Sequence, residues 1–128
     1  MGLISGLFGN ASEADAAALQ EELTALLAPE EQISKAFRIF RDLMVFTDRR
    51  LILIDKQGFT GSKVLYHSIL FRSITQFSVE TAGTFDADSE LRIWVSGAPE
   101  PVKKQFKRGT DIVGIQQHLA LCVGGGKK

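Results

Sequence analysis

Between residues 32 and 108, short runs of apolar and β-branched residues are separated by turn residues every eight to twelve positions. This spacing is typical of an all-β sandwich or barrel, and it predicts about seven antiparallel strands. Two runs, residues 43–46 and 51–54, are continuously apolar, so we expect both of their faces to be covered. The predicted strands lie near residues 33–39, 43–46, 51–54, 63–71, 75–81, 91–95 and 102–107.

Alternation within a run assigns its side chains to the two faces of a strand. The sets predicted to share a face are Ile33, Phe37 and Ile39; Thr75, Phe77, Val79 and Thr81; and Leu91, Ile93 and Val95. Trp94 and Arg92 then lie together on the opposite, outer face. A large aromatic side chain there needs cover, so we expect an interface with the N-terminal helix, a neighbouring subunit or a partner peptide.

Two helices are predicted to flank the strands. Leucines recur at helical spacing before Pro29, which disfavours helix in the residue preceding it, so residues 13–27 are predicted to form an amphipathic helix. Asp111 offers a capping oxygen for a second helix, which residues 124–126 end. Its apolar stripe consists of Ile112, Ile115, Leu119, Cys122 and Val123. The predicted organisation is an N-terminal segment with its helix packed on the domain (1–31), the domain itself (32–123) and a flexible tail (124–128).

The size and composition fit one globular domain. The chain has 128 residues, of which 45% are hydrophobic and 23% charged, and a chain of this length buries about two-thirds of its surface on folding. No apolar run approaches the ~20 residues of a membrane span. A single cysteine, Cys122, excludes an internal disulfide framework and fits a cytoplasmic location.

The charge is balanced overall but not along the chain. Fifteen basic and fifteen acidic residues give a net charge of zero, which argues against a nucleic-acid-binding protein. The first 31 residues carry six acids and no Lys or Arg. This acidic segment either forms a solvated helix or docks against the more basic remainder. Before it, an apolar stretch could insert into a groove of this chain, of a second copy or of a membrane surface; its large side chains are Leu3, Ile4, Leu7 and Phe8.

Basic residues offer only weak candidate anion contacts. Those in the first half are interspersed with Asp42, Asp48 and Asp55, which favours ion pairs across strands. The densest basic cluster is split between two strand faces by alternation. The candidates are Arg38, Arg49, Arg50, Lys56, Lys63, Lys103 and Lys104.

Catalytic, metal and cofactor sites are not expected. His67 and His118 lack any accompanying nucleophile motif. Asp86, Asp88 and Glu90 have the spacing of the first three ligands of a calcium-binding loop, but the required glycine and the distal glutamate are missing. These absences favour a non-enzymatic protein.

The order of these segments resembles the bacterial pleckstrin-homology-like (PH) domains over almost the whole chain. The sequence departs from the family pattern at Leu70-Phe71, where the family has proline followed by an aromatic residue. A local kink of the kind that proline produces is therefore not expected from the sequence at this position. The segments that carry the resemblance are Arg41-Asp42-Leu43, Phe46-Thr47-Asp48-Arg49-Arg50-Leu51-Ile52-Leu53, Asp55-Lys56-Gln57-Gly58, Tyr66-His67-Ser68-Ile69, Ser78-Val79-Glu80-Thr81-Ala82-Gly83 and Phe85-Asp86-Ala87-Asp88-Ser89-Glu90-Leu91.

The resemblance implies a seven-stranded PH-type bent antiparallel barrel of two near-orthogonal sheets, capped by the C-terminal helix. It also implies closed homo-oligomeric rings with five-fold symmetry. Phosphoinositide binding by related domains uses a long basic loop between the first two strands. Here that connection is at most Arg41-Asp42. The expected function is therefore a self-associating binding or scaffolding module, with an unidentified protein partner. The alternative is a peripheral membrane-surface or peptide-binding adaptor.

Overall fold

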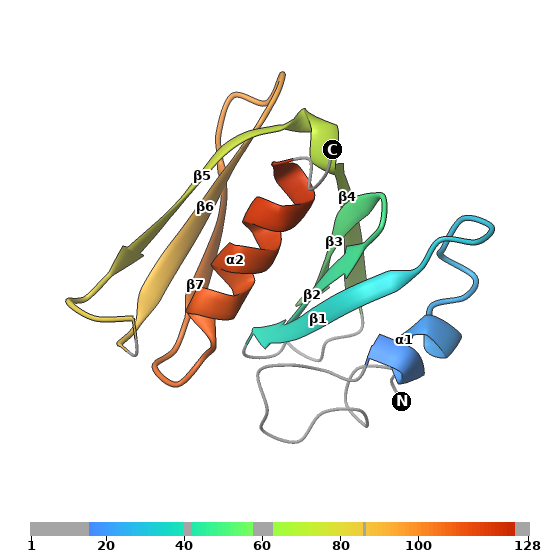
Figure 1. Cartoon of the computed structure of the whole chain (residues 1–128), viewed down its shortest axis with the longest axis horizontal. Coiled ribbons are helices and arrows are strands. Elements are labelled where there is room, and N and C mark those ends of the chain that lie inside the picture. The colour runs from blue at the N-terminus through green and yellow to red at the C-terminus, as the bar shows by residue number, and fades with distance from the viewer. Residues whose placement is uncertain (1–15, 40–41, 58–62, 86, 125–128) are drawn as a thin grey trace. The chain divides into compact units, whose positions relative to one another are not determined.

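The computed structural model describes residues 16–39, 42–57, 63–85 and 87–124, arranged in two compact units that divide after Ser68. The first unit contains α1 (Ala16–Glu22), β1 (Ile33–Ile39), β2 (Asp42–Thr47), β3 (Arg50–Gln57) and most of β4 (Lys63–Leu70). The second contains η1 (Phe71–Ser73), β5 (Ile74–Thr81), β6 (Ser89–Val95), β7 (Val102–Phe106) and α2 (Ile112–Val123). The predicted seven strands and two flanking helices are confirmed (Figure 1).

The first unit holds a four-stranded sheet in the order β1-β2-β3-β4. β1 pairs with β2, and β2 with β3, in antiparallel register. Residues 43–46 and 51–54 are buried throughout, which confirms that both faces of these strands are covered. On one face Phe37 meets Phe46 edge to face, with ring centroids 5.9 Å apart. The other face carries Ile33, Ala36, Leu43, Val45, Ile52 and Ile54.

A bulge in β1 corrects one predicted face. The register shifts between Ile33 and Lys35, so Ile33 opposes Thr47 while Ala36 opposes Val45. An extra residue in one strand reverses the alternation beyond it. Ile33 therefore shares a cluster with Ala36 and Val45, and not with Phe37 as strict alternation predicts.

Helix α1 packs on this Ile33–Ala36 face of the sheet and is shorter than the predicted 13–27. Leu19 and Leu23 are almost fully buried against the strands. The regular helix ends at Glu22, and hydrogen-bonded turns continue to Leu27. The Thr24 hydroxyl donates to the carbonyls of Gln20 and Glu21, which gives these helix-terminal oxygens a side-chain partner. Residues 13–15 of the predicted helix lie outside the described residues.

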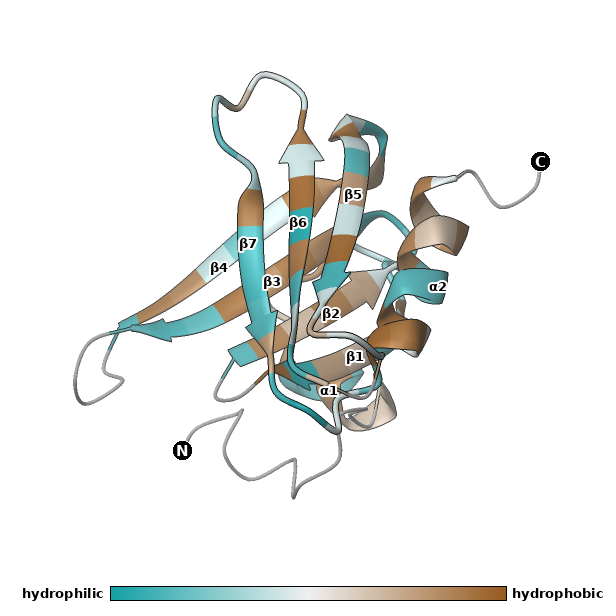
Figure 2. Ribbon diagram, turned by 90° about the vertical axis from the view of Figure 1, so that its left-hand side faces the viewer, coloured by the Kyte–Doolittle hydropathy of each residue, from teal (hydrophilic) through white to brown (hydrophobic). Residues whose placement is uncertain are grey.

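The second unit holds a three-stranded antiparallel sheet in the order β5-β6-β7. Leu91 and Ile93 of β6 are fully buried on one face. A register shift between Ile74 and Gln76 breaks the predicted set of β5, because Thr75 no longer shares a face with Phe77. Lys103, Lys104 and Gln105 make the middle of β7 hydrophilic (Figure 2).

Helix α2 begins where the sequence predicts. The Asp111 carboxylate accepts a hydrogen bond of 3.0 Å from the Gly114 amide and so caps the helix. A side chain at position 114 would collide with the Asp111 carboxylate, which would then have to move from its capping position. Ile112, Ile115 and Leu119 are buried, and a hydrophilic band at residues 116–118 separates two apolar turns (Figure 2).

Candidate functional site

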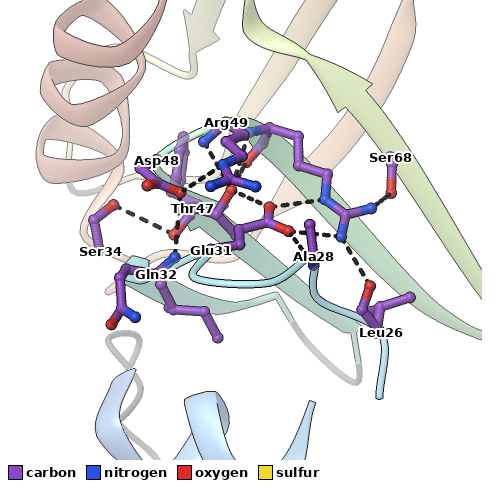
Figure 3. A network of polar contacts seen from close by, with 12 residues as sticks. Leu26, Ala28, Glu31, Gln32, Ser34, Thr47, Asp48, Arg49 and Ser68 are labelled. Atoms are coloured by element: carbon purple, nitrogen blue, oxygen red, sulfur yellow. Dashed lines mark hydrogen bonds and ion pairs between the residues drawn. The ribbon is translucent and has the colours of Figure 1, made fainter. Parts of the chain in front are cut away.

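Glu31 and Arg50 form an ion pair in which the carboxylate is buried (Figure 3). Arg50 Nε donates to Glu31 Oε2 and Nη2 to Oε1, both over 2.9 Å. The Glu31 side chain is 1% exposed and that of Arg50 is 18% exposed. Two parallel charge-assisted hydrogen bonds fix the orientation of both groups as well as their distance.

The remaining polar atoms of Glu31 also have partners. Its Oε1 accepts from the Ala28 amide over 2.8 Å, and its Oε2 accepts from the Thr47 hydroxyl over 2.6 Å. The Thr47 oxygen in turn accepts from the amides of Arg49 and Arg50. Glu31 therefore links the α1–β1 connection to the turn between β2 and β3.

The hydrogen bonds from Arg50 lower the pKa of Glu31 from 4.5 to about 2. Burial acts in the opposite direction, because it disfavours the charged form. The hydrogen bonds from Arg50, Thr47 and Ala28 together lower the pKa by more than burial raises it. Glu31 is thus a carboxylate at every physiological pH, and it serves as a structural anchor.

Arg50 extends the same network to β4. Its Nη1 donates to Ser68 Oγ and its Nη2 to the Leu26 carbonyl, both over 2.9 Å. Arg50, predicted as a weak anion contact, therefore has protein partners on three of its nitrogens. We call the set Leu26, Ala28, Glu31, Thr47, Arg50 and Ser68 the arginine clasp.

Strand β4 is an edge strand that is exposed on both faces. Seven of its eight residues are exposed, and Ile69 alone is buried. Large apolar side chains are among the exposed ones: Val64 (38%), Leu65 (43%), Tyr66 (40%) and Leu70 (38%). An apolar edge with unpaired backbone groups is a template for adding another strand. β4 is therefore the strongest candidate interface among the described residues.

A hollow of about 260 Å³ lies beside the turn between α1 and β1. The turn places Pro29 and Glu30 between Ala28 and Glu31, and the Glu31 amide donates to the Ala28 carbonyl. Glu30 has a φ of 67°, a left-handed conformation that favours glycine. The residues around the hollow are Gln20, Thr24, Leu27, Ala28, Pro29, Glu30, Glu31 and Gln32.

Trp94 and Arg92 share a face of β6, as predicted. The register opposes Trp94 to Gln76 and Arg92 to Ser78, whereas Leu91 and Ile93 point to the buried face. Trp94 is half-buried. The Arg92 guanidinium lies 2.7 Å from the Glu90 carboxylate and 3.7 Å from that of Glu80. The surroundings of Arg92 are therefore polar, and Trp94 contributes a large apolar side chain to the same face of β6.

The predicted basic residues of the first unit are not gathered in one place. Arg49 and Arg50 lie at the β2–β3 turn, and Arg49 Nε is 3.8 Å from Asp48. Lys56 is six residues further along β3, which is about 20 Å in an extended strand. Arg38 lies on β1 and has an interaction partner, and Lys63 begins β4.

In the second unit, Lys103 and Lys104 point to opposite faces of β7, because Lys103 opposes Arg92 and Lys104 opposes the buried Leu91. Cys122 is half-buried, and burial raises the pKa of its thiol. Within the described residues, no group of three or more His, Cys, Asp or Glu side chains could hold a metal ion. The predicted contacts Leu3, Ile4, Leu7 and Phe8 lie outside the described residues.

The arginine clasp is the feature that sequence reasoning missed. Glu31 follows Glu30 at the end of an acidic segment, and Arg50 follows Arg49, so each looks like one of a solvated pair. The distinction between Glu30 and Glu31 depends on which side chain faces Thr47. Only the three-dimensional register supplies that information.

A family model described as bacterial PH domain matches residues 2–123. The chain belongs to this family. The Bacillus subtilis (strain 168) protein YjqA is 58% identical over 125 residues, which are 96% of this chain and all of that protein. The crystal structure of a pleckstrin homology domain from Shewanella amazonensis SB2B is 54% identical, with a TM-score of 0.81, and covers 95% of this chain and 98% of its own.

A second solved structure gives the same result. It is a DUF1696 family protein with a pleckstrin-homology domain from Shewanella loihica PV-4, 52% identical with a TM-score of 0.77 over 91% of this chain and 99% of its own. The two solved structures therefore show that this bacterial PH domain has a PH-like fold. None of the described helices is long and apolar enough to cross a membrane.

Proposed function

We propose that this bacterial PH domain is a non-enzymatic scaffolding module of the cytoplasm that self-associates into a closed homo-oligomeric ring. The edge strand β4 forms the contact between subunits. The observation that carries this proposal is the exposure of both faces of β4, with three adjacent large side chains at Val64, Leu65 and Tyr66.

The four sheet edges differ in how well they are protected against pairing. Folded proteins blunt such edges with bulges, charged residues and proline. β1 has a bulge and two basic residues, β5 has a bulge, and β7 carries two adjacent lysines in its middle. β4 has one charged residue, Lys63, at its first position. β4 is therefore the edge least protected against another strand.

A ring places a further requirement on the contact. If β4 paired with β4 of a second copy, the interface would be two-fold and the assembly would stop at a dimer. A ring requires β4 to meet a different surface of the next subunit, and the rotation between subunits must close. The resemblance to the PH family suggests five copies.

Light scattering coupled to gel filtration tests the proposal directly. One chain has a mass of 14.0 kDa, so a five-membered ring has about 70 kDa. We expect Leu65→Lys and Tyr66→Lys to lower the mass to that of the monomer, since each adds a charge to the contact. The matched control is Leu121→Lys on α2, where the replaced leucine is 59% exposed. A wild-type mass of 14 kDa at micromolar concentration overturns the proposal.

The same preparation tests the alternative of a membrane-surface adaptor. We expect no flotation with anionic vesicles at low salt, because the described basic residues are dispersed over several strands and Arg49, Arg50 and Arg92 lie beside carboxylates. Binding at low salt that is lost at high salt would replace the scaffold with the adaptor.

A further inference from the structure

Strand β7 ends the second sheet, so in the described part of the chain one of its two backbone edges has no partner strand. The sheet has the order β5-β6-β7, and β6 lies between the other two strands (Figure 2). In an antiparallel pair, alternate residues of a strand direct their amide and carbonyl groups away from the neighbour. On the outer edge of β7, those groups are hydrogen-bonding sites to which an extended segment can add.

The side chains along and just beyond this strand are basic. Residues 101–110 contain no Asp or Glu, and they hold four cations: Lys103, Lys104, Lys107 and Arg108. No other stretch of six residues in the sequence contains four basic side chains. Lys103, Lys107 and Arg108 are exposed. The free edge of β7 therefore combines open backbone groups with a concentration of positive charge.

Lys103 lies opposite another cation within the sheet. It opposes Arg92 across the β6–β7 pair, and like charges at opposed positions repel each other. Arg92 has two carboxylates beside it, that of Glu90 at 2.7 Å and that of Glu80 at 3.7 Å. Lys103 forms no ion pair with any residue that the structure describes. An anionic group placed next to Lys103 would therefore compensate a charge that the sheet itself leaves uncompensated.

We propose that the free edge of β7 binds an extended acidic segment of a partner polypeptide, which adds to the second sheet as a further strand. Alternation places Lys103 and Lys104 on opposite faces of β7, so a compact anion such as phosphate would meet only one of them. An added strand also carries side chains on both faces. Acidic residues at consecutive positions of that strand would thus meet both lysines while its backbone bonds to the edge.

The edge strands of a second copy do not have the charge that this edge requires. β1 and β7 carry basic and no acidic residues, and the charged residue of β4 is Lys63. β5 has a bulge and one acid, Glu80, which already lies beside Arg92 of its own sheet. The lysines of β7 therefore disfavour the edges of the same protein and favour an acidic strand of another. This inference goes beyond the proposed ring and uses no β4 side chain.

Nucleic acids and anionic membranes are also anionic, but they fit the edge less well. Their phosphates would reach the cations on one face of β7 and would leave the backbone groups of its edge without partners. A polypeptide strand satisfies both the charges and the backbone groups. The chemistry of the edge therefore favours a peptide over either of these polyanions.

Fluorescence anisotropy of a labelled peptide tests the inference with the full-length protein. The probe has about eight residues, with a run of glutamates between pairs of valines. We expect Lys103→Glu to weaken its binding about tenfold, since an attractive contact becomes a repulsive one. The variant should fold, because glutamate opposite Arg92 replaces a repulsive pair with an attractive one. The matched control is Arg72→Glu, which reverses an exposed charge on η1. Equal weakening by both substitutions, or no binding at about 1 mM peptide, overturns the inference.

Two further measurements distinguish strand addition from attraction between charges alone. The same peptide with every internal amide N-methylated keeps its charges but cannot donate backbone hydrogen bonds, and we expect it to bind at least tenfold more weakly. Amide hydrogen exchange, followed by NMR, should slow at alternate residues of β7 when the unmodified peptide binds. Equal binding of the methylated peptide, binding without new amide protection, or equally tight binding of a single-stranded DNA of similar length would each overturn the inference. The monomeric Leu65→Lys variant should bind the peptide as the wild type does, so this result does not depend on the ring.

Discussion

Replacement of Glu31 by glutamine tests whether the arginine clasp stabilises the fold. Glu31→Gln keeps the shape of the side chain but removes the charge, and one oxygen acceptor becomes a donor facing the Arg50 guanidinium. The loss of one partner from a buried ion pair costs about 3–5 kcal/mol. Because Arg50 keeps some contact with solvent, we expect the lower limit, about 3 kcal/mol.

The lowered pKa of Glu31 gives a second order-of-magnitude value for the same interaction. A shift from 4.5 to about 2 corresponds to about 3 kcal/mol at ~1.4 kcal/mol per unit. A carboxyl whose pKa is lower in the folded state stabilises the fold above its unfolded pKa. This contribution is complete above pH 4.5 and disappears as the pH falls towards 2. The difference between wild type and Glu31→Gln should therefore be constant from pH 5 to 8 and shrink below that range.

Urea unfolding, followed by the fluorescence of the single tryptophan Trp94, measures this difference. At a fixed protein concentration we expect a loss of about 3 kcal/mol, or about 10 °C in melting temperature for a domain of this size. The control is Glu30→Gln, because Glu30 is the exposed neighbour of Glu31. If the two variants differ by less than about 0.5 kcal/mol at pH 7, the arginine clasp does not stabilise the fold.

Three further predictions concern other contacts and use the same unfolding measurement. Asp111→Ala removes the cap of α2 and should cost about 1 kcal/mol. Adding Gly114→Ala to that variant should restore stability, because alanine favours helix and no carboxylate is left to collide with its side chain. A further loss of stability in the double variant would contradict this explanation. Glu30→Gly should stabilise by about 1 kcal/mol, because glycine accepts the left-handed conformation, and a loss would show that no strain is present. Leu19→Ala should cost about 3 kcal/mol, against almost nothing for the exposed Leu121→Ala.

The strands could be predicted because runs of apolar and β-branched residues are bounded by turn residues in the sequence itself. The predicted runs 33–39 and 63–71 differ from the observed β1 and β4 by at most one residue. The β1 and β5 bulges could not be predicted in the same way. A bulge adds one residue to a strand and reverses the alternation beyond it, and its position depends on the pairing with the neighbouring strand.

The clasp shows a second limit of sequence reasoning. A capping residue such as Asp111 acts on an amide three positions away, so its role can be seen in the local order of residues. Glu31 and Arg50 are separated by nineteen positions, and Arg50 and Ser68 by eighteen. Contacts over such distances depend on how β2, β3 and β4 are aligned. A chain's linear order of charges does not determine that alignment.

These contacts also explain how β4 keeps its place while its side chains remain exposed. A strand is usually held in register because a slip of one residue would expose its buried face. β4 has one buried residue, Ile69, so burial alone specifies its register weakly. The hydrogen bond from Arg50 to Ser68 supplies a specific position instead, and the buried Glu31 carboxylate fixes Arg50. A strand positioned in this way can present Val64, Leu65 and Tyr66 to other segments without relying on those side chains for its own stability.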